Sequence, residues 1–186
     1  MRKIVMYNRV TLDGFYARPN GDIDWFINDP MVDRASHEMM SPDTILFGRV
    51  TYQQFESFWP AVAKNPEAPE GARMIAGELN KMTKVVFSTT LKEVTWENSQ
   101  LIGGNVAKEV EKLKQGDGPD IVIFGSGTIA QELARAGLID EYLIALTPVV
   151  LGEGKPMFEG VGHQDLKLLD SRTFESGNTM LRYAVG

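Results

Sequence analysis

The chain has 186 residues and no cysteine, which suits one domain, residues 1–186, that folds without disulfides in a reducing compartment such as the cytoplasm. Its net charge of −6 at pH 7 argues against a nucleic-acid partner, and no apolar run approaches the roughly 20 residues that a membrane span requires. Its two histidines, His37 and His163, are too few and too far apart for a metal site, and the lack of cysteine excludes thiolate catalysis and cysteine zinc sites.

Strands and helices alternate from the start of the chain. The short apolar segment at residues 3–8 predicts a buried strand, and the turn-forming tetrapeptides TLDG (11–14) and PNGD (19–22) predict a long loop after it. Loops of this length usually carry function or disorder. Asp29 suits the N-cap of a helix over residues 30–40, which a proline at its first position favours.

Four more elements follow in the first half of the chain. Residues 44–47 predict a second buried strand. The aromatic segment 52–59 predicts a helix that stops before Pro60, because proline cannot donate the helical hydrogen bond. Residues 65–70, with two prolines, predict a surface loop, and a short helix ends at residues 78–82.

The centre of the chain repeats this alternation. Residues 84–88 and 94–96 predict two more strands. Residues 106–114 place apolar side chains at helical spacing and charged ones elsewhere, and so predict an amphipathic helix. The apolar run 121–124 predicts another buried strand, followed after a glycine-rich turn by a helix over 128–136.

The C-terminal part of the chain is predicted to form strands. Residues 142–151 predict a long strand in which Pro148 implies a sheet edge, a bulge or a bend. Residues 166–174 and 179–185 predict an antiparallel hairpin. Together these elements predict an α/β layered fold with a mostly parallel sheet and an antiparallel C-terminal edge hairpin.

The motif GSGT at residues 125–128 is the most informative stretch of the chain. Glycines directly after a buried strand let backbone amides approach a ligand, and the amides that begin a helix bind anions such as a pyrophosphate. Gly125, Gly127 and Ala130 also fit a dinucleotide-binding pattern, but the acidic ribose ligand expected about 20 residues later is Ala145 instead. Two interpretations stay open, a phosphate-binding turn and a tight strand-to-helix turn with no ligand.

Three predicted strands end in glycine or small polar residues. Residues 45–47 lead to GRVT, 85–87 lead to STT, and 122–124 lead to GSGT. The carboxyl ends of parallel strands gather at one edge of a sheet, where open α/β sheets bind their ligands. We therefore expect a groove lined by phosphate-binding turns at this edge. Arg49 suits a phosphate because its guanidinium donates hydrogen bonds in pairs, and the alternative is a solvated surface arginine.

Several motifs, taken in order, resemble the dihydrofolate reductase superfamily. The likeness is closer to the C-terminal reductase domain of the bifunctional deaminase/reductase of bacterial riboflavin biosynthesis, and to its stand-alone relatives. The motifs that carry it are TLDG at 11–14, GRVTY at 48–52, FGSGT at 124–128, GLIDEY at 137–142 and TPVVLGEG at 147–154. Each is weak alone, but their order and spacing cover nearly the whole chain. The resemblance implies a three-layer α/β/α fold of the dihydrofolate reductase type.

The same resemblance implies NADPH as the cofactor. In such proteins the turns that correspond to GRVT at 48–51 and GSGT at 125–128 hold the pyrophosphate of NADPH. The residues that follow the strand predicted here at 85–87 hold its adenosine phosphate. The implied cofactor ligands in this chain are Gly48, Arg49, Thr51, Ser88, Thr89, Gly125, Ser126, Gly127 and Thr128. A plain strand-ending turn is the alternative for Ser88 and Thr89.

The substrate side of the site is less well defined by the motifs. Dihydrofolate reductases use a carboxylate on the first helix to help protonate a pteridine ring, and Asp24 is the candidate here among several acids of residues 24–37. Trp25 suits stacking on a heterocycle, and Asp13 and Glu153 are further candidate substrate contacts. The alternatives are an exposed acid beside a half-buried tryptophan, a loop brace for Asp13, and a turn residue for Glu153.

The resulting hypothesis is an NADPH-dependent reductase that transfers hydride to a small heterocycle. The expected substrates are an aminopyrimidine similar to 5-amino-6-(5-phosphoribosylamino)uracil, or a pterin. One alternative is a non-catalytic dinucleotide-binding or regulatory module of the same fold. Another is a homodimer in which the strand at residues 142–151 completes the cleft across the interface.

Overall fold

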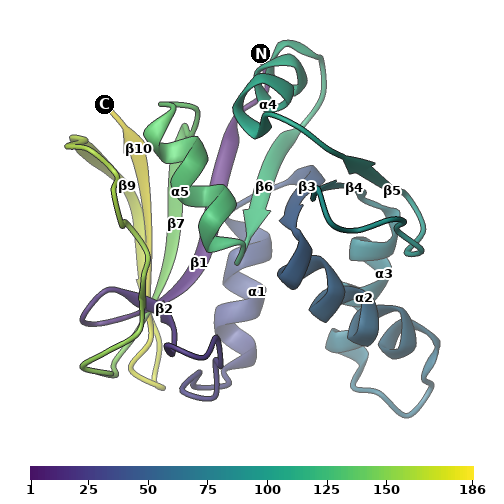
Figure 1. Cartoon of the computed structure of the whole chain (residues 1–186). Coiled ribbons are helices and arrows are strands. Elements are labelled where there is room, and N and C mark those ends of the chain that lie inside the picture. The colour runs from purple at the N-terminus through teal and green to yellow at the C-terminus, as the bar shows by residue number, and fades with distance from the viewer.

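A computed structural model describes all 186 residues of the chain. Eight strands form the main sheet, and two short strands form a second one. The main-sheet strands are β1 (Ile4–Thr11), β3 (Pro42–Gly48), β4 (Thr83–Phe87), β5 (Ser99–Ile102), β6 (Asp120–Phe124), β7 (Glu141–Thr147), β9 (Leu166–Thr173) and β10 (Thr179–Val185). The small sheet pairs β2 (Phe15–Ala17) with β8 (Lys155–Pro156). The order in the main sheet is β5-β4-β3-β6-β1-β7-β10-β9 (Figure 1).

Helices cover both faces of the main sheet. They are α1 (Pro30–Glu38), α2 (Arg49–Lys64), α3 (Glu70–Lys81), α4 (Val106–Gln115) and α5 (Gly127–Arg135). Side chains of α4 and α5 pack in one core cluster, and side chains of α1, α2 and α3 pack in the other. None of the helices has the length and apolar character that a membrane crossing requires.

The strands from β1 to β7 in the main sheet are parallel, and β10 and β9 add an antiparallel edge. Alternate residues of β1 enter opposite cores, Ile4 and Met6 in one and Val5 in the other, so the start of the strand is apolar on both faces. The three-layer architecture, the mostly parallel sheet and the C-terminal hairpin predicted from the sequence are confirmed.

The carboxyl ends of three predicted strands lie together at one edge of the sheet, as the sequence predicts. β4, β3 and β6 are consecutive neighbours in the sheet, so their carboxyl ends lie at one edge. The backbone N–H of Gly48, at the end of β3, donates to the hydroxyl of Ser126, after β6, at 2.8 Å. The turns after β3 and β6 are therefore in direct contact, although 78 residues separate these two positions in sequence.

Two sequence predictions in the middle of the chain are wrong. Helix α2 does not stop before Pro60 but continues to Lys64. Proline has a helical φ and removes only one hydrogen bond, and packing of Phe55 and Trp59 on the core outweighs that loss. Residues 94–96 are not a strand, because Trp96 is buried from a loop and its Nε1 donates to Asn80 Oδ1 at 2.7 Å.

The end of the predicted strand at residues 142–151 also differs. β7 ends at Thr147, directly before Pro148, and the N–H of Val149 turns back to the carbonyl of Thr147 at 2.8 Å. The proline therefore terminates the strand instead of bending it. The chain then continues into β8, which pairs with β2, and neither of these short strands was predicted.

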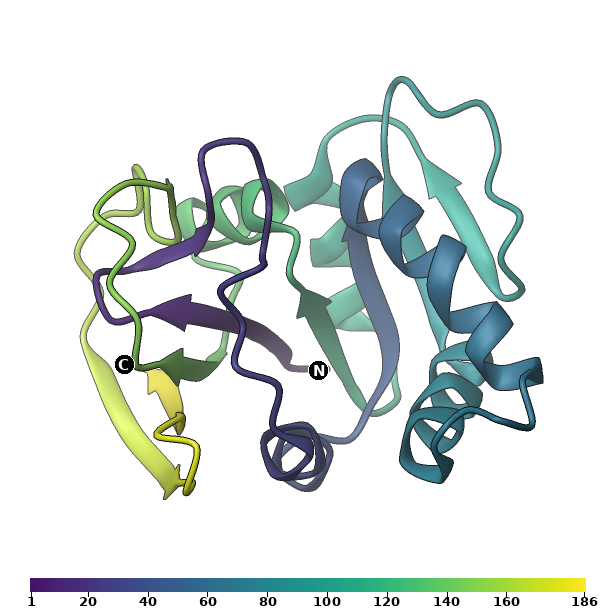
Figure 2. The ribbon, with the colours of Figure 1, turned by 90° about the horizontal axis from the view of Figure 1, so that it is seen from below.

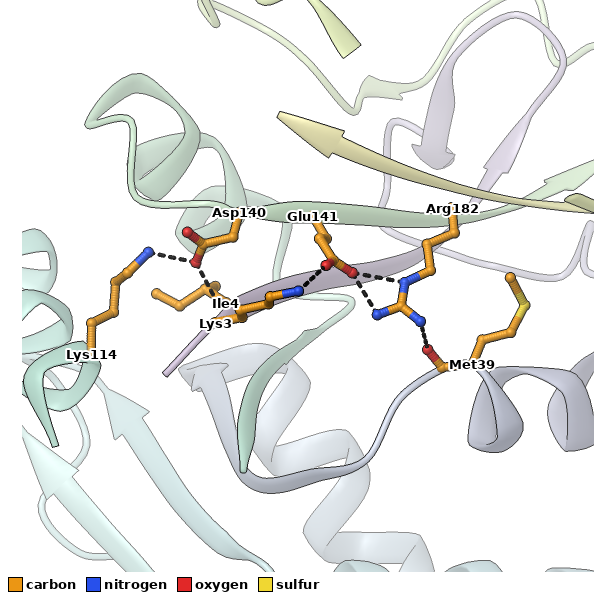
Figure 3. Close-up of polar contacts among 7 residues, drawn as sticks. All are labelled: Lys3, Ile4, Met39, Lys114, Asp140, Glu141 and Arg182. Carbon is orange, nitrogen blue, oxygen red and sulfur yellow. Dashed lines mark hydrogen bonds and ion pairs between the residues drawn. The ribbon is translucent and has the colours of Figure 1, made fainter. Parts of the chain in front are cut away.

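A charged network lies at the opposite end of the sheet from the carboxyl edge (Figure 3). The Glu141 side chain, 4% exposed, accepts from Lys3 Nζ at 2.7 Å and from Arg182 Nη2 at 2.6 Å. Arg182 also donates through Nη1 to the carbonyl oxygen of Met39, the residue that ends α1, at 2.5 Å. Burial opposes the charge of Glu141, but the hydrogen bonds from Lys3 and Arg182 prevail and lower its pKa. The network thus ties α1 to the sheet.

Candidate functional site

A cleft of about 1090 Å³ extends from the carboxyl ends of β1, β3 and β6 to residues 40–43, at the amino end of β3. Its floor comes from β1 and β6, one wall from α1, and the other from α2 and α3. The turns that begin α2 and α5 form its upper rim. The edge that the sequence predicts to bind ligands therefore carries the main cavity of the molecule.

The rim of the cleft presents two helix starts without side-chain caps. The N-cap residues of α2 and α5 are Gly48, which has no side chain, and Ser126, whose hydroxyl accepts no hydrogen bond from its own helix. The Ser126 hydroxyl accepts from Gly48 instead. The first amides of a helix have no intrahelical partner, so these two ends offer donors to an anion. Gly125, with φ +65°, makes the left-handed turn that leads into α5.

Arg49 is the first residue of α2 and lines this rim. Its Nη1 donates to Gln53 of the same helix at 3.2 Å, and no carboxylate lies within ion-pair distance of it. Thr51 stands beside Gly125, where a Cβ on the glycine would lie 3.5 Å from Thr51 Cγ2. The guanidinium is exposed and free to pair with a phosphate.

The structure does not bring every predicted cofactor ligand into the cleft. Gly48, Arg49, Thr51 and residues 125–128 all line it, whereas Ser88 and Thr89 do not. The Ser88 hydroxyl accepts from the N–H groups of Thr90 and Leu91, at 3.1 and 3.0 Å, and braces the turn after β4. Thr89 is exposed on the same sheet edge. A role for these two residues at the adenosine end stays a prediction.

An ion pair inside the cleft was not predicted. Arg9 of β1, whose side chain is 11% exposed, places Nη2 2.6 Å from Oδ1 of Asp33 on α1. Its Nη1 donates to the carbonyl of Ile27 at 3.1 Å, and its guanidinium lies 5.2 Å from the ring centroid of Phe26. The available sequence signal was an arginine that follows the apolar start of a buried strand, where an unpaired charge is costly.

Asp24 and Trp25 lie just outside the cleft lining. Asp24, with a side chain 65% exposed, pairs with Arg18 Nε at 2.5 Å. Trp25 is buried against Phe26, with 4.6 Å between ring centroids, and its Nε1 has no hydrogen-bond partner. Their catalytic and substrate-binding roles remain predictions. The carboxylate that does line the cleft from α1 is Asp33.

Asp13 and Glu153 lie on loops next to the small sheet. Asp13 accepts from the Thr11 hydroxyl at 2.6 Å and from the N–H groups of Gly152 and Leu151 at 2.8 and 3.1 Å. These bonds, that of Thr11 foremost, lower the pKa of Asp13. Glu153 is exposed, and neither acid lines the cleft, so their substrate contacts remain predictions. The geometry of Asp13 is that of a loop brace.

Aromatic side chains line the middle of the cleft. Phe55 packs against Phe124 and Trp59, with ring centroids 6.1 and 6.2 Å apart, and Phe26 and Tyr7 also line the cavity. Burial raises the pKa of Tyr7, which favours its neutral phenol. Of the other aromatics of α2, Tyr52 is fully buried in the core and Phe58 faces solvent. The cleft thus joins a rim of two helix starts to an aromatic slot that contains the Arg9–Asp33 ion pair.

No group of three or more potential ligand side chains could hold a metal ion. The donors of the rim, in contrast, suit the phosphates of a dinucleotide, because two open helix starts and an unpaired arginine lie together with Gly125. These features define an α/β protein with a large cleft that combines two open helix starts with aromatic walls.

Comparison with known proteins agrees with this class. Residues 2–180 match the model of the RibD C-terminal domain family, and the chain belongs to that family. The uncharacterized protein YyaP of Bacillus subtilis is 36% identical to it over 184 residues, which is 98% of this chain and 94% of YyaP.

Solved structures share its fold. A Shewanella sp. PV-4 protein, whose place in riboflavin biosynthesis is itself only inferred, has a TM-score of 0.71 at 21% identity, with 99% of each chain covered. The Thermotoga maritima diaminohydroxyphosphoribosylaminopyrimidine deaminase/5-amino-6-(5-phosphoribosylamino)uracil reductase has a TM-score of 0.68 at 15% identity, over all of this chain and 57% of the other. Dihydrofolate reductase of Enterococcus faecalis, complexed with NADP(H), has a TM-score of 0.65 at 13% identity, over 99% and 96%. The predicted dihydrofolate-reductase-like fold is confirmed.

Proposed function

We propose that this protein is an NADPH-dependent reductase that transfers hydride to a small heterocycle. The observation that carries the proposal is the rim of the cleft, where two uncapped helix starts and the unpaired Arg49 converge. Membership of the RibD C-terminal domain family supports a reductase of the riboflavin-pathway type. The substrate would be an aminopyrimidine similar to 5-amino-6-(5-phosphoribosylamino)uracil, or a pterin.

The cofactor would be held mainly through its phosphates. Arg49 and the amides of residues 125–128 would bind the pyrophosphate, with Thr51 beside them, and Ser88 and Thr89 would bind the adenosine phosphate. The nicotinamide supplies the hydride, and the protein supplies position and electrostatics. Gly125, whose φ is +65°, would let the backbone of this turn approach the phosphates without a side chain in the way.

The substrate ring would lie in the aromatic slot of the cleft. Phe26, Phe55 and Trp59 offer flat faces for stacking, and the Arg9–Asp33 pair offers a donor and an acceptor to the edge of a heterocycle. Asp33 joins Asp24 as a candidate for the acidic residue. Asp33 has the more suitable geometry, because it lies on α1 and lines the cleft.

A titration with NADPH and NADH, followed by nicotinamide fluorescence, tests the proposal. Tight binding with a preference for NADPH would support it, and no binding of either would refute it.

Arg49→Ala should weaken NADPH binding by about 1–3 kcal/mol, the scale of a charge-assisted hydrogen bond. Arg73→Ala is the matched control, because Arg73 is exposed on α3 and outside the cleft lining. Equal affinities for the two variants would rule out the phosphate role of Arg49.

One observation favours the alternative of a non-catalytic nucleotide-binding module. Each acid that lines the cleft is already paired, Asp33 with Arg9, Glu78 with His37, and Asp43 with Arg2. Every lining carboxylate therefore already has a basic side chain of the same chain as its partner. NADPH binding without oxidation by any pterin or aminopyrimidine would favour this module over the reductase.

Two further parts of the hypothesis concern the setting of the reaction. A cytoplasmic location is proposed because a cysteine-free chain suits a reducing compartment. A homodimer that completes the cleft is the second alternative, and a mass measurement in solution tests it. A monomeric mass would remove that alternative.

A further inference from the structure

The segment between β1 and α1 crosses the carboxyl edge of the sheet. It runs from the side of α5 to the side of α1 and passes over the end of β1, as the view from below shows (Figure 2). Its only strand is β2, which pairs with β8. Tyr16, in the middle of β2, lines the cleft and packs against the core cluster of α4 and α5. A residue from a loop thus reaches the rim.

Tyr16 lies directly on Gly127, the first residue of α5. A Cβ at Gly127 would stand 2.6 Å from both Cε1 and the hydroxyl oxygen of Tyr16, closer than real side chains come. Only glycine at 127 therefore leaves room for this ring. Gly127 is the second glycine of the GSGT motif, so contact with Tyr16 explains why this position of the motif is a glycine.

The hydroxyl of Tyr16 is available to a ligand. No side-chain hydrogen bond of the chain involves it, and it is not enclosed, because the side chain is only partly buried and borders the cavity. Burial, with a smaller effect from the charge of Glu159, raises the pKa of Tyr16, so the phenol stays protonated at neutral pH. It is therefore a hydrogen-bond donor beside the open start of α5.

Contacts outside the cleft hold the ring in place. The N–H of Met157 donates to the carbonyl of Gly14 at 2.9 Å, and Asp13 accepts from the N–H of Gly152 at 2.8 Å. Gly154 allows β8 to approach β2 closely, since a Cβ there would lie 2.6 Å from the carbonyl oxygen of Ala17. These contacts fix both sides of Tyr16, so its position does not depend on a ligand.

We infer that Tyr16 is a cofactor-contacting residue of the cleft, whose hydroxyl donates to a phosphate or ribose oxygen of a dinucleotide bound at the start of α5. This inference rests on the proposed function, because it takes NADPH as the ligand of the rim. It adds a contact from β2 to those from α2 and α5, because Tyr16 and Arg49 both line the cleft.

The test is a fluorescence titration of NADPH against Tyr16→Phe, which keeps the ring and removes the hydroxyl. The dissociation constant should rise about five- to tenfold, the effect of losing one hydrogen bond, while the melting temperature stays the same. The matched control is Tyr183→Phe, on β10 and outside the cleft lining, which should not change binding. An affinity of Tyr16→Phe within about twofold of the unmodified protein would overturn the inference.

A second variant tests the contact between the ring and the helix. Gly127→Ala should push the Tyr16 ring away from α5, so it should weaken NADPH binding and add little when combined with Tyr16→Phe. Fully additive losses would contradict the inference. If the unmodified protein does not bind NADPH, the proposed function itself fails. If it binds NADPH and Tyr16→Phe binds equally well, only the role of Tyr16 fails.

Discussion

Replacement of Glu141 by Gln tests how far the network at the far end of the sheet stabilises the fold. The carboxylate accepts from Lys3 at 2.7 Å and from Arg182 at 2.6 Å, and its side chain is 4% exposed. Glutamine keeps the shape of the side chain but removes the charge that both cations share. Arg182, 24% exposed, would then be left mostly buried without a counter-charge.

The exposure of the two partners sets the size of the effect. Breaking a fully buried pair costs about 3–5 kcal/mol, whereas an exposed pair contributes about 0–1 kcal/mol. Lys3 is 57% exposed, so its pair with Glu141 should contribute about as much as an exposed pair. Arg182 is 24% exposed, so its pair with Glu141 should contribute nearly as much as a buried pair. We therefore expect Glu141→Gln to lower the free energy of unfolding by about 2–3 kcal/mol at pH 7.

Urea unfolding between pH 7 and pH 3 measures this effect and its origin. The pKa of Glu141 is lowered from its ordinary value of 4.5 in the folded state. Its contribution is therefore complete above that value and is lost as the pH falls through the lowered folded pKa. The stability gap between the two proteins should shrink below pH 4.5. A gap that is absent at pH 7, or that stays constant down to pH 3, would refute this reasoning.

Exposure is controlled for by Glu109→Gln, because Glu109 pairs with Lys112 on the surface of α4 at 2.7 Å. That variant should stay within about 0.5 kcal/mol of the unmodified protein in its free energy of unfolding.

Arg182 also donates to the carbonyl of Met39 at the end of α1. Disturbing Glu141 should therefore loosen the helix that carries Asp33, which hydrogen exchange of α1 would detect.

Two other changes give clear outcomes. Gly125→Val should abolish NADPH binding, because the branched side chain would occupy the space of the pyrophosphate. The left-handed φ of +65° at this position should also lower the stability by about 1–2 kcal/mol. Tight binding by a folded variant would contradict the phosphate-binding turn. Lys84→Met should lower the urea midpoint, since Lys84 Nζ donates to the carbonyls of Leu79, Met82 and Asn80 at 2.7, 2.8 and 3.1 Å, and unpaired buried carbonyls cost about 1–3 kcal/mol each. An unchanged midpoint would mean that water replaces the ammonium.

The sequence predicted the parts of the fold that depend on local pattern. The turns after β3 and β6 are each recognisable alone, and the geometry of a parallel sheet then brings them to one edge. The Arg9–Asp33 pair could not be found in this way, because 24 residues separate its members and their contact depends on how α1 lies on β1. The strand predicted at residues 94–96 is absent, because valine, threonine and a buried tryptophan are typical of strands but here belong to a loop.

Short elements with distant partners were also beyond prediction. β2 has three residues and β8 has two, which is too few for any periodicity. Their pairing places Tyr16 against Gly127 and lets Asp13 reach Gly152, 139 positions away. The sequence marked the glycine at 127 as part of either a phosphate-binding turn or a tight turn with no ligand, and neither interpretation included contact with a distant side chain.

The hydrogen bond from Gly48 to Ser126 bears on the kinetics of ligand capture. It joins the starts of α2 and α5 through the chain's own atoms, so the two turns hold their spacing before any ligand arrives. A ligand that binds there loses little free energy to the ordering of loops, and its association rate should approach that of a preformed site. Ser126→Ala would leave the Gly48 amide unpaired and let the two turns drift, which would slow capture more than it would hasten release.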